Sequence, residues 1–230
     1  TVALAARRAQ RNGHRRVAIV DFDVHHGNGT QDMFADDPTV LYISVHRYDR
    51  RTFYPRTGGV HETGRAAGKF YSVNIPLTAT GMGDNEYALV FDAVVLPVLL
   101  AWAPDALLVS AGFDAATADP VGLMDVSPVG FGYMMHRLLD VQAAPAVFLE
   151  GGYNLAALAD GAVALMDVLA RRARGDADDT DWPTVFASVD PTKASTVAKK
   201  NVKAVIDAVG PHWRKVHGAT FREDLANARK

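Results

Sequence analysis

The chain has 230 residues, of which 49% are hydrophobic, and it carries a formal net charge of −2 with a pI near 6.4. This is enough apolar material for one sizeable α/β domain. The balanced charge excludes a global basic field that would draw the protein directly to nucleic acid or to an anionic membrane. The absence of cysteine excludes disulfides and thiolate ligands, which leaves His, Asp and Glu as candidate metal ligands. No apolar stretch reads as a membrane span or a signal peptide, so the sequence predicts a soluble protein. An intracellular location is expected, cytoplasmic or nuclear, and the sequence does not decide between nucleus, cytoplasm and a bacterial cell.

Apolar runs of strand length alternate with longer helical patterns along the chain. A short helix over residues 2–10 precedes the first strand. An amphipathic helix is predicted from Tyr87 to Trp102, and Pro97 is expected to kink it. A further helix is predicted to begin at Ser127-Pro128, with serine as the N-cap residue and proline at the first helical position. A last clear helix covers Leu155 to Arg174. The predicted strands are 17–23, 40–46, 71–77, 106–112 and 146–151.

This alternation predicts an α/β fold, with a parallel sheet covered by helices on both faces. In such sheets the ligand site lies beyond the carboxyl ends of the strands. The first strand ends in the polar cluster Asp21 to Thr30. Carboxylates that follow a buried strand must be paired or must coordinate a cation, and Asp23 and His25, two apart on a strand, point the same way. A carboxylate and an imidazole suit zinc or another first-row divalent metal.

Other strand ends also carry polar residues. Asp114 follows the buried run 107–109 and can supply a third ligand, although it could equally cap the next helix. Gly151 and Gly152 allow close backbone approach to a ligand, and Tyr153 can present its hydroxyl there, although a tyrosine in the core is the simpler interpretation. Four strand ends that agree favour a site.

These residues resemble the zinc-dependent histone deacetylases, most closely the class II branch and its bacterial amidohydrolase relatives. The resemblance implies the three-layer fold shared by arginases and deacetylases, and it spans about residues 1–174. The segments that carry it occur in family order: 21–30, 43–49, 53–55, 71–77, 110–114 with Asp119-Pro120, and 150–154.

The resemblance implies that Asp23, His25 and Asp114 bind zinc, and that Tyr153 stabilises the oxyanion during amide hydrolysis. It also implies two structural potassium sites. The first would use Asp21 with backbone oxygens near Asp23, His25, Ser44 and Val45, and the second the backbone oxygens of Phe34, Asp37, Val40 and Tyr71.

The resemblance also places Tyr54, Val121 and Gly152 around a narrow channel for an acyl-lysine. Polyamine-specific members carry an acidic residue at the position of Val121. An apolar valine offers no partner for a second ammonium, so an acetyl-lysine in a protein or peptide is favoured over an acetylpolyamine.

One family feature is missing from the chain. The family's histidine pair, which acts as general base and electrostatic partner, lies upstream of the Asp-x-His strand, and this sequence opens at Thr1 within the preceding helix. His26 and His46 are expected to be structural and not substitutes. The chain resembles the C-terminal two-thirds of a catalytic domain, so we expect these 230 residues to form a single deacetylase-like domain that binds zinc with negligible turnover alone. Its acidic linker would cover about 175–190, and a C-terminal helix over 191–217 would pack on the core.

Two alternatives stay open. Arginases and agmatinases share the fold but bind two manganese ions through Asp-x-His-x-Asp, and the last position here is Gly27. A degenerate, non-catalytic binding module is the other. The sequence leaves the oligomeric state undetermined.

Overall fold

The computed structural model describes residues 1–49, 52–174 and 181–226. Its centre is a five-stranded, all-parallel sheet in the order β3-β2-β1-β4-β5. The strands are β1 (Val17–Asp21), β2 (Val40–Arg47), β3 (Ser72–Leu77), β4 (Ala106–Ala111) and β5 (Ala146–Leu149). The parallel sheet with helices on both faces, predicted from the alternation of elements, is confirmed.

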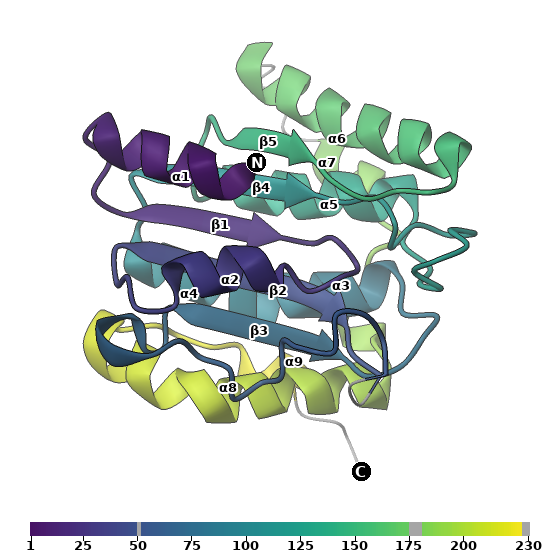
Figure 1. Cartoon of the computed structure of the whole chain (residues 1–230). Coiled ribbons are helices and arrows are strands. Elements are labelled where there is room, and N and C mark those ends of the chain that lie inside the picture. The colour runs from purple at the N-terminus through teal and green to yellow at the C-terminus, as the bar shows by residue number, and fades with distance from the viewer. Residues whose placement is uncertain (50–51, 175–180, 227–230) are drawn as a thin grey trace.

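The helices form the outer layers, as Figure 1 shows. The bounds are α1 (Val2–Arg11), α2 (Asn28–Phe34), α3 (Asp84–Val90), the π-helical turn η2 (Phe91–Val95), α4 (Leu96–Trp102), α5 (Pro128–Leu139), α6 (Leu155–Arg174), α7 (Trp182–Val185), α8 (Thr196–His217) and α9 (Glu223–Ala226), with 3₁₀ turns η1 (Ala66–Gly68) and η4 (Pro191–Lys193). The first two helices cover one face, and α3, α4 and α5 cover the other.

The strand alternation of β1 explains why it is buried on both faces. Val17 and Ile19 pack toward α1, whereas Ala18 and Val20 point into the larger core on the opposite face. All five residues of β1 are buried. Polar atoms therefore have no place along the strand and gather where it ends.

Within the helix predicted over 87–102, Pro97 follows a π-helical turn. The Leu96 amide bonds to the Phe91 carbonyl, five residues back, in place of the usual four. A π-turn one residue before proline accommodates the missing N–H and the bulk of its ring. An extra residue in one turn thus lets the helical run continue through Pro97.

The continuous run Asp84–Trp102 is long and apolar enough to cross a membrane, which the sequence analysis did not expect of any segment. However, 78% of its most apolar window is buried inside the protein. The run is the central core helix of the fold, and its apolarity reflects packing on the sheet.

The C-terminal helix begins later than predicted, at Thr196, where the Ser195 side chain accepts from the Ala198 amide. It lies along β3 and also contacts α3 and α4 (Figure 1). Part of the predicted acidic linker, residues 175–180, lies outside the described residues, and α7 occupies part of the remainder.

Candidate metal and catalytic site

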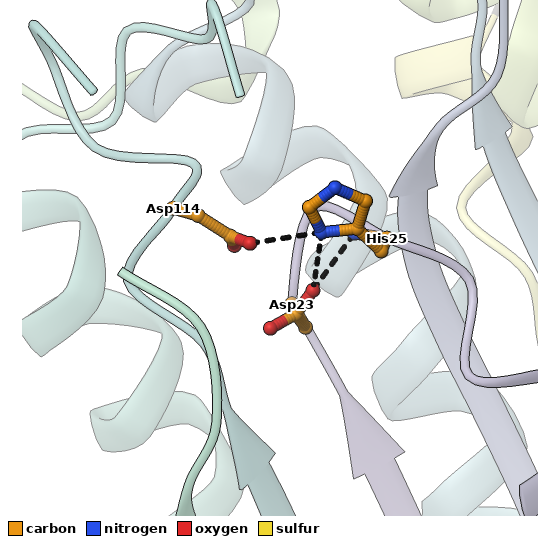
Figure 2. Close-up of side chains that lie close together, drawn as sticks. All are labelled: Asp23, His25 and Asp114. Carbon is orange, nitrogen blue, oxygen red and sulfur yellow. Dashed lines mark hydrogen bonds and ion pairs between the residues drawn. The ribbon is translucent and has the colours of Figure 1, made fainter. Parts of the chain in front are cut away.

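Asp23, His25 and Asp114 converge beyond the carboxyl ends of β1 and β4. Figure 2 shows the three side chains pointing toward one another. His25 Nδ1 lies 3.1 Å from Asp23 Oδ1 and 3.0 Å from Asp114 Oδ2. One candidate ligand atom from each residue lies within 4.8 Å of the others. Among the described residues, this is the one group of three His, Asp or Glu side chains with that geometry.

The local structure that joins Asp23 to His25 differs from the prediction. We expected both on one strand, but β1 ends at Asp21, and the next residues form a bend. The Asp23 carboxylate accepts from the backbone amide of His25 at 2.8 Å. A side chain that accepts from the amide two residues on forms an Asx-turn, so a turn and not strand alternation brings the two side chains together.

Backbone amides fix both carboxylates from outside the triad. Asp114 Oδ1 accepts from the Val24 amide at 2.8 Å, and Asp23 Oδ2 accepts from the Gly151 amide at 2.8 Å. A Cβ on Gly151 would lie 2.4 Å from Asp114 Oδ2 and 2.7 Å from Asp23 Oδ2. Only glycine leaves room for both carboxylates at this position, as the sequence analysis expected of a close backbone approach.

The electrostatics of the triad suit a cation. Burial lowers the pKa of His25, but hydrogen bonds and charges from Asp114 and Asp23 outweigh it and raise that pKa to about 9. Burial and the charge of Asp23 raise the pKa of Asp114. For Asp23, burial is outweighed by hydrogen bonds from His25 and Gly151, which lower its pKa. A proton on His25 Nδ1 therefore lies between two carboxylates. A divalent cation bound by His25 Nδ1, Asp23 Oδ1 and Asp114 Oδ2 can take the place of this proton.

A cavity of about 470 Å³ opens beside the triad. Its lining includes Asp23, His25, Gly151, Gly152 and Tyr153. The donor set of two carboxylate oxygens and one imidazole nitrogen matches a zinc site that keeps a position open for water or substrate. The residues present thus fit a catalytic metal.

Of the predicted catalytic and channel residues, Tyr153 and Gly152 line the cavity, whereas Tyr54 and Val121 do not. Tyr153 follows Gly152, whose φ is +144°, and its side chain is 55% exposed. Burial, Asp114 and Asp23 raise the pKa of Tyr153, which keeps its hydroxyl protonated as a donor. Tyr54 stands edge-on to the His25 ring at 6.2 Å between centroids, and Val121 is 37% exposed.

The two histidines that we expected to be structural are buried in a polar network outside the triad, although His26 also lines the cavity. His26 bonds to the Thr57 hydroxyl at 2.8 Å and to Gln31 at 3.2 Å. His46 pairs with the Ser44 hydroxyl and the Gly58 carbonyl, each at 2.9 Å. Burial and then the neighbouring His26 lower the pKa of His46 to about 3, so it stays neutral.

The residues of the first predicted potassium site lie together where β1 ends beside the middle of β2. Asp21 pairs in register with Ser44, and Val45 follows it in β2. Asp21 is buried and accepts from the Tyr42 hydroxyl at 2.9 Å. Burial and the charge of Asp23 raise its pKa well above the usual range.

The second predicted potassium set lies near the start of β2. The carbonyls of Phe34, Asp37 and Tyr71 accept backbone bonds from Asp37, Val40 and Tyr42, respectively. No observation on the described residues tests either potassium site, so both stay predictions.

Sequence reasoning missed three residues beside the site. Phe53 stacks on His25 with ring centroids 5.0 Å apart. The Arg47 guanidinium carbon lies 4.3 Å from the centre of the Phe53 ring. Asp119 accepts backbone bonds from Tyr153 and from its own loop. All three belong to the segments that carry the family resemblance. Their place in those segments was the one sequence feature that could have indicated a position beside the site.

Comparison with known protein families decides the identity of the fold. The model for the histone deacetylase domain matches residues 1–169. The chain belongs to the histone deacetylase family. Histone deacetylase 15 of Arabidopsis thaliana is 48% identical over 168 residues, covering 73% of this chain and 30% of the relative. HDA1 of Candida albicans is 44% identical over 174 residues, covering 73% and 21%, respectively.

Solved deacetylase structures agree with this assignment. The crystal structure of the HDA15 HD domain superposes with a TM-score of 0.81 at 39% identity, covering 93% of this chain and 55% of that one. The structure of the histone deacetylase Clr3 gives the same TM-score at 35% identity, covering 93% and 35%. The α/β deacetylase-like fold is confirmed, and the chain spans about half or less of these relatives.

Proposed function

We propose that this deacetylase-family chain belongs to a zinc-dependent enzyme that hydrolyses the acetyl amide of acetyl-lysine in proteins or peptides. The observation that carries the proposal is the convergence of Asp23, His25 and Asp114 beside Tyr153, next to a cavity of about 470 Å³. Family membership supports deacetylation in general, and the donor set supports zinc in particular.

Asp23, His25 and Asp114 would hold the zinc. When bound, zinc would polarise the amide carbonyl and acidify a water molecule. Tyr153, kept protonated, would donate a hydrogen bond to the carbonyl oxygen as it gains negative charge. A donor placed in this way stabilises the transition state more than the ground state, and its removal typically costs ~10²-fold or more in rate.

The channel residues support acetyl-lysine as the substrate class. Tyr54 would form one aromatic wall beside His25 and shield the amide from water, and Gly152 would let the backbone approach the substrate. Val121 presents an apolar surface with no charge for a second ammonium, which favours an acetyl-lysine stem over an acetylpolyamine.

The general base is the part of the machinery that the described residues do not supply. His26 and His46 both bond to other groups in the buried network. We therefore propose that these 230 residues alone bind zinc and turn substrate over negligibly. We also propose that structural potassium ions neutralise Asp21 and support the loop after α2.

The test is hydrolysis of an acetyl-lysine peptide by the full-length natural protein with zinc, followed by chelation and zinc restoration. The expected result is zinc-dependent release of acetate, with acetylpolyamine a poorer substrate and negligible rate from the 230-residue chain alone. An inactive, zinc-free full-length protein would instead favour a non-catalytic binding module, and two manganese ions per chain would favour an arginase-like site.

A further inference from the structure

The Asp119 carboxylate joins two loops that flank the metal triad. One loop follows β4 and carries Asp114 and Val121, and the other follows β5 and carries Tyr153. Asp119 Oδ1 accepts from the amides of Val121 at 2.8 Å and Gly122 at 3.0 Å. Its Oδ2 accepts from the amides of Tyr153 at 2.8 Å and Asn154 at 3.2 Å. One side chain thus serves four amides from two segments.

Only half of this arrangement is explained by the local turn. An aspartate that accepts from amides two and three residues on is a common turn device. The bonds from Oδ2 span 34 and 35 residues and serve no helix or strand ladder. Because the Asp119 residue is only 3% exposed, these charge-assisted bonds face little competition from water.

Tyr153 depends on this bond more than a buried tyrosine would. Its side chain is 55% exposed, so packing restrains it weakly. The preceding Gly152, at φ +144°, adopts a backbone conformation that residues with a side chain rarely adopt. The position of the hydroxyl is therefore set mainly by where the Tyr153 backbone is held, and Asp119 holds it.

The same carboxylate ties Tyr153 to the metal ligand and the channel. Gly122, bonded to Oδ1, packs so closely on the Asp114 backbone that a Cβ there would lie 1.7 Å from the Asp114 carbonyl oxygen. On its other side, the Gly122 carbonyl accepts from Arg47 at 3.1 Å. A second link, from Asn154 Nδ2 to the Ala118 carbonyl at 3.1 Å, joins the same two loops.

We propose that Asp119 is a positioning residue that fixes the Tyr153 hydroxyl relative to Asp114 and the channel residue Val121. This inference rests on the proposed function, because it assigns Tyr153 the role of oxyanion donor. The predicted consequence is that loss of the carboxylate lowers kcat through Tyr153 and leaves substrate binding nearly intact.

The test uses Asp119→Asn, which keeps the shape but turns one acceptor oxygen into a donor group. Amide hydrogen exchange of the zinc-loaded protein is expected to be at least about tenfold faster at residues 153–154, with β2 unchanged. The matched control is Asp105→Asn, since Asp105 accepts from the amides of Arg15 and Arg16 at the amino ends of β1 and β4, away from the site. That variant should leave exchange at 153–154 unchanged.

Kinetics on the full-length natural protein then separate positioning from general stability. We expect Asp119→Asn to lower kcat about tenfold or more with KM within about threefold, but to change kcat less than about twofold in the Tyr153→Phe background. Wild-type kcat in Asp119→Asn, equal losses in both backgrounds, or unchanged exchange at 153–154 would each overturn the proposal.

Two other results are possible, an inactive wild-type protein and an Asp119→Asn variant that does not fold. If the wild-type protein hydrolyses no acetyl-lysine peptide, the proposed function fails, and the exchange measurement alone decides whether Asp119 holds the Tyr153 loop. If Asp119→Asn does not fold, Asn154→Ala removes the second link between the same loops and is judged by the same criteria with smaller expected changes.

Discussion

Replacing Gly151 with alanine adds one methyl group beside two carboxylates of the proposed zinc site. The new Cβ would lie 2.4 Å from Asp114 Oδ2 and 2.7 Å from Asp23 Oδ2. A carbon and an oxygen in ordinary contact are about 3.5 Å apart, so at least one carboxylate must move by about 1 Å. The φ of Gly151 lies outside the left-handed region, so the effect of alanine is steric and not a backbone conflict.

Metal ligands tolerate displacements of only about 0.2 Å. We therefore expect Gly151→Ala to weaken zinc binding by about 10- to 100-fold, or roughly 1.4–2.7 kcal/mol, as for other groups that orient metal ligands. The assay is calorimetric or competitive zinc titration of the metal-free protein.

The matched control is Gly132→Ala in the buried middle of α5. A Cβ there would meet its nearest atoms at 3.6 Å, an ordinary contact. Alanine in a helix is favoured over glycine by about 0.5–1 kcal/mol, so this variant should bind zinc normally and unfold at slightly higher denaturant. Zinc affinity of Gly151→Ala within threefold of wild type would refute the reasoning.

Three other predictions follow from the same geometry. Tyr153→Phe in the full-length natural protein should lower kcat about 10²-fold with little change in zinc affinity. The same change at the exposed Tyr54 should alter kcat less than about threefold. Equal losses of kcat in the two variants would contradict the role assigned to Tyr153. Zinc at 100 times its dissociation constant should stabilise the chain by about 2.7 kcal/mol against urea, and Asp114→Ala should abolish this gain; a persistent gain would place the zinc elsewhere. His46, with a folded pKa of about 3 against 6.5 unfolded, stabilises the fold above pH 6.5, and this contribution is lost as pH falls toward 3. Between pH 3 and 6.5, His46→Gln should reduce the slope of unfolding free energy against pH by about 1.4 kcal/mol per pH unit. His14→Gln, at an exposed position, should leave the slope unchanged. Equal slopes in wild type and His46→Gln would show that His46 titrates normally in the folded state.

The sheet could be predicted from sequence because β1 to β4 are almost entirely buried and read as apolar runs, whereas β5 is partly exposed. One helix start was equally clear from sequence: Ser127 accepts from the amides of Val129 and Gly130, as its place before Pro128 predicts. The ends of the strands were less so. β1 stops at Asp21 because the next carboxylate, Asp23, accepts from the amide of His25 in its own loop, and periodicity carries no sign of that competition.

The candidate site was predictable to the extent that its residues sit at strand ends. Topology brings Asp114 to Asp23, since β4 lies beside β1 in the sheet. The contacts that come from long loops were not predictable. The stacking of Phe53 on His25 and the bond from Tyr153 to Asp119 depend on loop conformations that no local pattern specifies.

The central claim is that Asp23, His25 and Asp114 together hold one zinc ion. Anomalous diffraction at the zinc edge, on crystals of the zinc-loaded protein, tests it most directly. We expect a single strong peak within coordinating distance of both carboxylates and of His25 Nδ1. No peak at the triad, or two metal ions bridged by these side chains, would contradict it.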